Sequence, residues 1–260
     1  MNFIKMHGCG NDYIFIDCFN GAPARPKQLA IRLSDRNTGI GGDGLVLIER
    51  SQIAHARMRI FNTDGTEAQM CGNAIRCVGR YLFESGTAPF TNLNIETRAG
   101  VRQVEVLTPF FKGGAGVVGV KPTRAGVFNV RVDMGPVTVR RSLVDVGNPH
   151  RPIQCDDVDA ATLGPHLGNR VNTEYFQIIG PNHIKMRVYE RGSGETRACG
   201  TGACAVAAFA DRHALVDPAT PITVDMLGGT LTIDIAPDGK NFHAHMTGPA
   251  VTSFTGVTHD

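Results

Sequence analysis

The sequence predicts an α/β (α+β) fold of two similar, pseudo-symmetric lobes, and three observations carry this prediction. Met58–Gly72 (MRIFNTDGTEAQMCG) aligns without gaps on Met186–Gly200 (MRVYERGSGETRACG) at a constant offset, with Met, Arg, Glu, Cys and Gly identical. Each repeat has the pattern of a strand, a glycine-containing turn, a cysteine and a helix. Each half also opens on Gly-Asn and later carries a Met followed by Gly-Pro. We therefore expect an N-terminal lobe over 1–131 and a C-terminal lobe over 132–248.

The individual elements follow from the spacing of apolar side chains. Ala56–Asn62 and Ile184–Glu190 alternate or run apolar with β-branched and aromatic members, which predicts a strand in each repeat. Asn73–Phe83 has apolar residues at helical spacing, and Ala203–His213 is almost wholly small and apolar, as in a helix buried on all sides. Further strands are expected in four Val/Ile-rich runs: Leu93–Thr97, Val127–Val132, Ile222–Asp225 and Thr230–Ile235.

Composition limits the classes of protein that the chain can belong to. The 260 residues include 26 Lys and Arg against 24 Asp and Glu, a formal net charge of +2, which argues against a nucleic-acid-binding stripe or a membrane-surface arm. No apolar run approaches the roughly 18 residues that a spanning helix needs, and no secretory leader is visible at the start. Seven irregularly spaced cysteines favour a reduced, cytoplasmic protein. Packing in the interior explains five of them, all except Cys71 and Cys199.

Cys71 and Cys199 stand at equivalent places in the two repeats, each at the start of a predicted helix. A helix N-terminus lowers the pKa of a thiol from about 8.5, and its N–H groups bind carboxylates. Two such ends facing one another would place a sulfur on each side of a small carboxylate ligand. One thiolate could then remove an α-proton while the opposing thiol returns one to the other face. This chemistry inverts a stereocentre and requires neither metal nor organic cofactor.

Two other uses of these cysteines were weighed. The spacings Cys71 to Cys77 and Cys199 to Cys204 differ from the C-x(2–4)-C of structural zinc sites, and the chain has no C-x-x-C redox motif. A non-enzymatic alternative stays open, in which Cys71 and Cys199 join reversibly in a thiol switch or a ligand-binding protein.

Six motifs together resemble the diaminopimelate epimerase family: MHGCGNDY (6–13), GIGGDG (39–44), IFNTDGTEAQMCGNAIRCVGRYL (60–82), VGNPH (146–150), RVNTEYFQII (170–179) and VYERGSGETRACGTGACA (188–205). The resemblance implies that each lobe is a mixed β-sheet wrapped around a central helix, with the active site in the cleft between the lobes. It implies that 249–260 returns to the N-terminal lobe. It further implies cofactor-independent interconversion of LL- and meso-2,6-diaminopimelate, with Cys71 and Cys199 as thiolate and thiol, lost to a disulfide on oxidation.

The same resemblance gives roles to further residues. Gly72, Asn73, Gly200 and Thr201 would offer backbone N–H groups to the reacting carboxylate. Glu190 would meet the reacting ammonium, Arg191 the distal carboxylate, and His150 would tune the cysteines together with Glu190. The remaining substrate-binding residues are asparagines: Asn11, Asn62, Asn148 and Asn172.

The substrate has a second candidate. The segments before Gly147 and Arg170 are shorter than the family's usual ones, which affects the distal half of the substrate pocket. A racemase of another amino acid, such as histidine, with the same cysteine pair is therefore the alternative. In either case we expect a small amino acid as the partner, with no metal, no cofactor, no nucleic acid and no membrane, and we leave a homodimer open.

Overall fold

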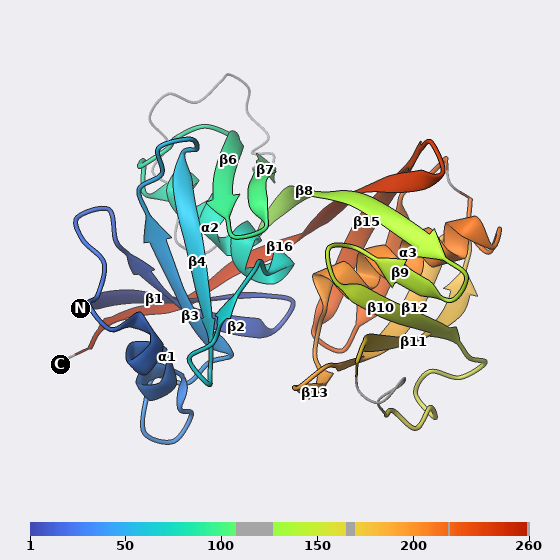
Figure 1. The fold of residues 1–260 in the computed structure, drawn as a ribbon, viewed down its shortest axis with the longest axis horizontal. Helices are drawn as coiled ribbons and strands as arrows, with labels where there is room; N and C mark the ends of the chain where they lie inside the picture. Colours follow the sequence, from blue (N-terminus) through green and yellow to red (C-terminus); the bar gives the residue numbers. More distant parts are fainter. Residues whose placement is uncertain (108–126, 165–169, 218, 259–260) are drawn as a thin grey trace. The chain divides into compact units, whose positions relative to one another are not determined.

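The computed structural model describes residues 1–107, 127–164, 170–217 and 219–258. These ranges contain β-strands and three α-helices, joined by turns and loops (Figure 1). The chain forms two compact units. Unit 1 comprises Met1–Gly8, Asp12–Val132 and Pro249–Asp260, and unit 2 comprises Cys9–Asn11 and Asp133–Gly248. Cys9–Asn11, which the sequence analysis counted with the N-terminal lobe, therefore belong to unit 2. Gly228 packs so closely on this segment that an added Cβ would lie 1.8 Å from the Cys9 carbonyl oxygen.

Unit 1 is a mixed sheet curved around a buried helix. Its strands follow the order β8-β7-β6-β4-β3-β2-β1-β16, with the β2–β3 and β4–β6 pairs parallel. Helix α2 contacts β1 as well as β6 and β7, which lie toward opposite ends of this order, so the sheet wraps around it. The bounds are β1 Asn2–Gly8, β2 Asn11–Asp17, α1 Pro26–Ser34, β3 Gly44–Glu49, β4 Ala56–Asn62, β5 Glu67–Ala68, α2 Gly72–Glu84, β6 Asn92–Thr97, β7 Gly100–Leu107, β8 Phe128–Arg140 and β16 Asn241–Val257.

Unit 2 repeats this arrangement around α3. Its strand order is β8-β9-β10-β11-β12-β14-β15-β16, with the β10–β11 and β12–β14 pairs parallel. Helix α3 contacts β9, β10 and β11 on one side of this order and β14 and β15 on the other. The bounds are β9 Leu143–Asp145, β10 Pro149–Gln154, β11 Asn172–Gly180, β12 His183–Glu190, β13 Gly194–Thr196, α3 Gly200–Arg212, β14 Ile222–Met226 and β15 Gly229–Asp238.

The pairing types coincide strand by strand, which confirms the predicted α+β class with one central helix in each lobe. In unit 1, the strand before Cys71 is β4, which pairs antiparallel with the short strand β5 and parallel with β6, the strand after α2. In unit 2, the strand before Cys199 is β12, which pairs in the same two ways with β13 and β14. Helix α1 has no counterpart among the described residues between β10 and β11. It packs Leu29, Ala30 and Leu33 into the apolar core of unit 1 together with Phe61.

Two long strands, β8 and β16, run through both units and also pair with one another. In unit 1, β16 pairs antiparallel with β1, with Asn2 opposite Val257. Two buried arginines of α2 fix the start of this segment. Arg76 Nε donates to the Pro249 carbonyl at 3.1 Å, and Arg80 Nη1 donates to the Ala250 carbonyl at 2.8 Å. The central helix of unit 1 thereby holds the final strand through charged side chains rather than through apolar contact alone.

The sequence located both repeats but not every strand. The predicted strand Ala56–Asn62 has the bounds of β4, and the predicted helices correspond to α2 and α3 within a few residues. The expected strand Val127–Val132 is too short, because β8 continues to Arg140. The elements that were not predicted are helix α1 and strands β1, β2, β3, β5, β7, β9, β10, β11, β13 and β16. None of the helices in the described ranges has the length and hydropathy needed to cross a membrane.

Candidate functional site

Cys71 and Cys199 occupy the same position in the two units, the N-cap of the central helix. Both have extended backbone, with φ and ψ of −139° and 120° at Cys71 and −129° and 112° at Cys199. The carbonyl of each accepts the first helical hydrogen bond at 3.0 Å, from Ile75 in α2 and from Ala203 in α3. The predicted placement of both thiols at a helix start is confirmed.

In unit 1, Cys71 lies at a half-exposed helix end beside an aromatic hydroxyl. The Tyr13 hydroxyl and Cys71 Sγ are 3.5 Å apart, within hydrogen-bonding distance for sulfur. Gly72 and Asn73 follow as the first buried residues of α2. Asn73 Oδ1 accepts from Arg76 Nη2 at 2.9 Å. The Asn73 side chain therefore supports the helix start, and the backbone N–H groups of the first turn are those that have no acceptor within the helix.

Asn62 and Asn11 belong to different units. Asn62 is exposed at the end of β4, and its Nδ2 donates to Thr66 Oγ1 at 2.9 Å within the turn to β5. Asn11 belongs to unit 2, in the segment that packs on Gly228. The structure thus brings Cys71, Gly72 and Asn73 together in unit 1.

In unit 2, Cys199 is buried among polar groups. Its Sγ accepts from the backbone N–H of Gly202 at 3.4 Å and lies 3.4 Å from Thr201 Oγ1. A hydrogen bond also links its side chain to the carboxyl of Glu190, which accepts in turn from Thr196 Oγ1. Cys199, Thr201 and Glu190, all selected from the sequence, therefore form one contiguous group.

The pKa of Cys199 is raised well above its usual value, which corrects the expectation of a thiol made acidic by its helix. Burial is the main cause, and the nearby charges of Glu190 and Glu174 add to it. The hydrogen bonds from Thr201 and Gly202 at the helix start lower this pKa, but they are outweighed. Burial likewise raises the pKa of the Glu190 carboxyl. In this state Cys199 is a protonated thiol.

Beneath the first turn of α3 lies a buried pair that joins His150, a residue selected from the sequence, to Glu174, which was not predicted. His150 and Glu174 are both fully buried, and His150 Nδ1 is 2.6 Å from Glu174 Oε1. The other ring nitrogen, Nε2, is 3.1 Å from Asn148 Oδ1. Glu174 Oε2 is buried without a hydrogen-bond partner. A Cβ on Gly202 would lie 2.9 Å from Glu174 Oε1, so the carboxylate fits against the helix only because that position is glycine.

The parallel pairing of β10 with β11 explains this assembly. His150 on β10 stands opposite Asn172 on β11, and Glu174 lies two residues after Asn172 on the same strand. Asn172 Oδ1 accepts from the backbone N–H of Arg191 at 2.9 Å and so fixes the chain just after Glu190, while Arg191 itself is exposed. Glu174 could have been selected from the sequence because it is an acidic residue inside the otherwise apolar segment VNTEYFQII. A carboxyl that is buried in such a strand needs a specific polar partner.

The other cysteines are in different environments. Cys9, Cys18, Cys77 and Cys204 are buried, as packing residues should be, and burial raises the pKa of Cys77 to about 12. Cys155 is only partly buried, which corrects the prediction that packing explains all five remaining thiols. Its Sγ lies 3.5 Å from the Phe176 carbonyl, to which it donates.

The fold is shared with solved structures of other two-lobed α+β proteins. Solved structures of a PhzF-family phenazine biosynthesis protein from Bacillus anthracis and of a probable proline racemase from Agrobacterium radiobacter K84 superpose with TM-scores of 0.74 and 0.68, at 16% and 15% identity. The first comparison covers 100% of this chain and 99% of the other, and the second covers 99% and 92%. At these identities the likeness concerns the fold alone.

The sequence comparisons are more specific. The diaminopimelate epimerase family model matches residues 3–139 and 142–253. Proteins named diaminopimelate epimerase from Acetivibrio thermocellus and Bacteroides thetaiotaomicron are 40% and 42% identical to this chain. Each comparison covers 98% of this chain, and 98% and 97% of the relative, respectively. The chain belongs to the diaminopimelate epimerase family.

Proposed function

We propose that this protein is an isomerase that interconverts LL- and meso-2,6-diaminopimelate by moving the α-proton of one stereocentre. The observation that carries the proposal is the matched pair Cys71 and Cys199, each at the N-cap of a central helix, in a chain about 40% identical over nearly its whole length to diaminopimelate epimerases. Such a reaction supplies a precursor for lysine and cell-wall synthesis.

The proposed chemistry uses the two thiols as base and acid. A thiolate takes the α-proton from one face of the carbon, and the opposing thiol gives its proton to the other face, so that the two sulfurs exchange protonation states. The first-turn N–H groups of α2 and α3 receive the substrate carboxylate and stabilise the charge that spreads onto it. In the resting protein Cys199 carries the proton, which favours Cys71 as the thiolate.

Glu190, Glu174 and His150 set the electrostatics around Cys199. Two carboxyl groups near the sulfur favour its thiol form. A substrate ammonium arriving at Glu190 would offset that negative charge and so help Cys199 to release its proton when required. We propose that Glu190 meets the reacting ammonium for this reason. His150, held between Glu174 and Asn148, positions the Glu174 carboxyl below the helix.

The distal half of the substrate is assigned to Arg191 and the asparagines. The exposed Arg191 guanidinium is available to form a bidentate pair with the distal carboxylate. Asn11, Asn62, Asn148 and Asn172 are proposed to bind the remaining polar groups. For Asn62 this requires the exchange of its hydrogen bond to Thr66 for one to substrate.

The test is α-proton exchange in D2O, followed by NMR under reducing conditions. LL-diaminopimelate, L-histidine, L-lysine and L-ornithine are incubated in parallel with the protein and with the Cys199→Ser variant as control. Exchange confined to diaminopimelate supports the proposal. Exchange with histidine instead keeps the cysteine roles and changes the substrate, whereas the absence of exchange with all four would favour the thiol-switch alternative.

Two further expectations accompany this function. We propose that the protein works in the cytoplasm, where its free thiols stay reduced, and a homodimer is an assembly open to test. Multi-angle light scattering of the purified protein would measure the mass of the particle directly. A mass near the 27.9 kDa of one chain would exclude the homodimer.

A further inference from the structure

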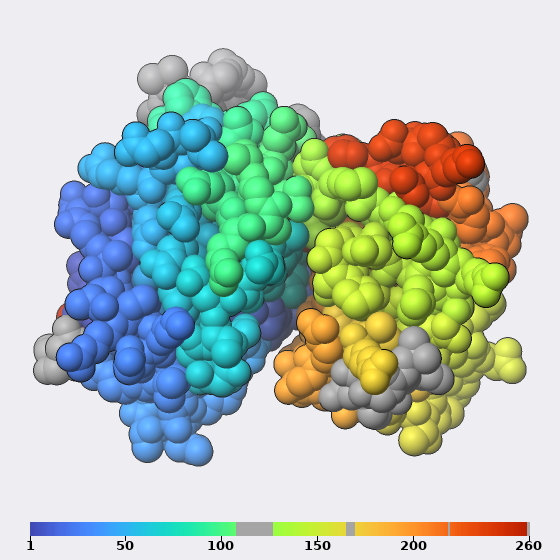
Figure 2. Space-filling view, viewed as in Figure 1, coloured from blue at the N-terminus to red at the C-terminus, as the bar shows by residue number. Residues whose placement is uncertain are grey.

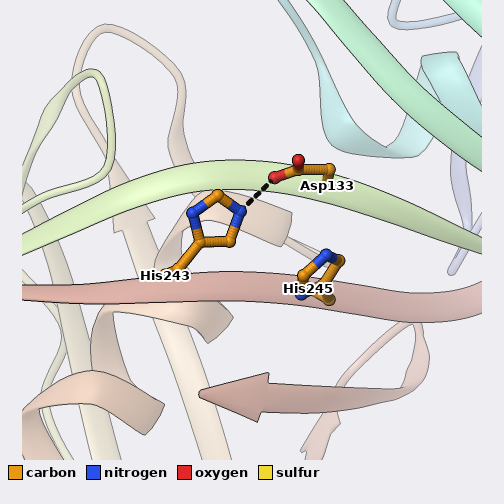
Figure 3. A group of neighbouring side chains, drawn as sticks. All are labelled: Asp133, His243 and His245. Atoms are coloured by element: carbon orange, nitrogen blue, oxygen red, sulfur yellow. Dashed lines mark hydrogen bonds and ion pairs between the residues drawn. The ribbon is translucent and has the colours of Figure 1, made fainter. Parts of the chain in front are cut away.

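Three potential metal ligands that have no role in the proposed function gather on the two long strands. Asp133 lies on β8, and His243 and His245 lie on β16. One ligand atom from each residue lies within 4.8 Å of the other two. The three side chains point toward one another in Figure 3. In the space-filling view, the start of β16 and the latter part of β8 meet at the surface of unit 2 (Figure 2).

Strand alternation explains why these side chains share one face. His243 and His245 are two residues apart on β16 and half-buried, whereas Phe242, Ala244 and Met246 on the opposite face are buried. Asp133 is likewise half-buried, between the buried Val132 and Met134 of β8. The cluster is therefore accessible to an ion from solvent and does not form part of the apolar core.

Two of the potential ligand atoms, His243 Nε2 and Asp133 Oδ1, already form a hydrogen bond with one another. His243 Nε2 is 2.6 Å from Asp133 Oδ1, which also accepts from the backbone N–H of Gly135 at 2.8 Å. The two imidazole rings lie 5.1 Å apart between centroids. Asp234 of β15 stands opposite His245 in register and adds a second carboxylate to the surroundings of the cluster. Two imidazoles and nearby negative charge are the surroundings that a divalent transition ion prefers.

We propose that Asp133, His243 and His245 bind one divalent transition-metal ion, with Zn²⁺ as the best match. Zinc takes imidazole nitrogen and carboxylate oxygen at about 2.0–2.2 Å, which places neighbouring ligands roughly 3.4 Å apart in a tetrahedral site. Small side-chain rotations would bring the three atoms to that separation. The ion takes the place of the proton between His243 Nε2 and Asp133 Oδ1, the neutral ring carries its proton on Nδ1 instead, and water occupies the fourth position. The site would tie β8 to β16.

Cobalt titration of the reduced, EDTA-treated full-length protein tests this site. Co²⁺ replaces Zn²⁺ at such sites, and its spectrum reports the ligands. We expect one equivalent to bind with weak visible d–d bands, without the intense near-ultraviolet charge-transfer band of a thiolate ligand. Competition by Zn²⁺ should remove these bands. A thiolate band, or binding of less than one equivalent at saturation, would overturn the proposal because it would assign the metal to the cysteines or to no defined site.

A matched control is available within the same unit. His183 Nε2 is also 2.6 Å from a carboxylate, Asp225 Oδ2, with similar exposure. Asp133→Asn, His243→Gln and His245→Gln should each weaken Co²⁺ binding at least tenfold, whereas His183→Gln should leave it unchanged. Circular dichroism identifies any variant that fails to fold. Equal affinity in the wild type and in folded His243→Gln and His245→Gln would exclude the site.

Discussion

At the scale of single residues, the environment of each thiol decides how it can be used. Cys71 is half-exposed beside Tyr13, whereas Cys199 is buried among Thr201, Glu190 and Glu174. The same N-cap position therefore gives the sulfur different surroundings in the two units. Helix position alone does not set the pKa of a thiol, because burial and neighbouring carboxylates can outweigh the helix end.

Replacement of either thiol tests the two-base mechanism. Cys71→Ser and Cys199→Ser should each lower the rate of stereoinversion about 10²–10⁴-fold, because a serine hydroxyl is a poor base at neutral pH. Cys155→Ser is the control, since that thiol is partly exposed but stands outside both groups. Its activity should stay within about twofold of the wild type, as measured by coupled assay with circular dichroism as the folding check. Substantial turnover by either single active-site variant would contradict the mechanism.

Glu190→Gln should lower the pKa of Cys199, because it removes one of the negative charges that hold the sulfur protonated. In the wild type, alkylation of Cys199 by iodoacetamide should stay slow at neutral pH and accelerate only in alkaline solution. In the variant the acceleration should begin at lower pH. Mass spectrometry of the Cys199 peptide across a pH series measures the shift, and Glu195→Gln, in an exposed pair with Arg187, should not change it. An unchanged or higher midpoint in Glu190→Gln would refute the electrostatic account.

At the scale of elements, the two central helices are built differently. Helix α3 is made of small apolar residues and accommodates Glu174 against Gly202. Helix α2 instead buries the whole side chains of Arg76 and Arg80. Arg76 joins the Gly72 carbonyl, Asn73 Oδ1 and the Pro249 carbonyl, so it couples the turn that follows Cys71 to β16.

Arg76→Met should therefore destabilise the protein by about 3 kcal/mol, because three buried acceptors lose a charged donor. Arg25→Met, at an exposed residue whose side chain makes no capping hydrogen bond at α1, should change the stability by no more than about 0.5 kcal/mol. Urea unfolding of both variants gives the two free energies. A loss below about 1 kcal/mol for Arg76→Met would show that water satisfies these acceptors.

An element could be predicted when its residue pattern was local and distinct from the patterns of other elements. The strand-turn-Cys-helix repeat was visible because its signal is local and occurs twice. Strand β3 (GLVLIE) is a short apolar run buried along most of its length, and periodicity does not distinguish such a run from a piece of helix. The length of β8 was missed because Gly135 and Pro136 interrupt the Val-rich pattern, although the strand continues through them to Arg140.

At the scale of the whole molecule, the duplicated pairing order means that each unit has its own cysteine and its own helix end. We propose that both cysteines serve one substrate carbon, which makes activity sensitive to oxidation of the pair. Diamide should inactivate the protein and dithiothreitol should restore it, through a Cys71–Cys199 bond that requires Cα atoms within about 7 Å. The Cys155→Ser variant should respond in the same way.

Non-reducing peptide mapping measures this directly. The inactivated protein should yield a linked pair of peptides containing Cys71 and Cys199, and the pair should separate on reduction. If both thiols are alkylated as free groups in fully inactivated protein, the oxidation acts elsewhere, with Cys155 as the first thiol to examine.

The sequence by itself determined the duplicated α+β class, the two cysteines at helix starts and the family, because repeats, periodicity and motifs are properties of neighbouring residues. Only the tertiary structure decided the protonation of Cys199, the buried His150–Glu174 pair, the role of Arg76 and the Asp133–His243–His245 cluster. These depend on partners brought together from distant parts of the chain, as His243 is bonded to Asp133 across 110 residues. Burial and long-range pairing change the pKa of a group and the ligands around it, and no local pattern carries that information.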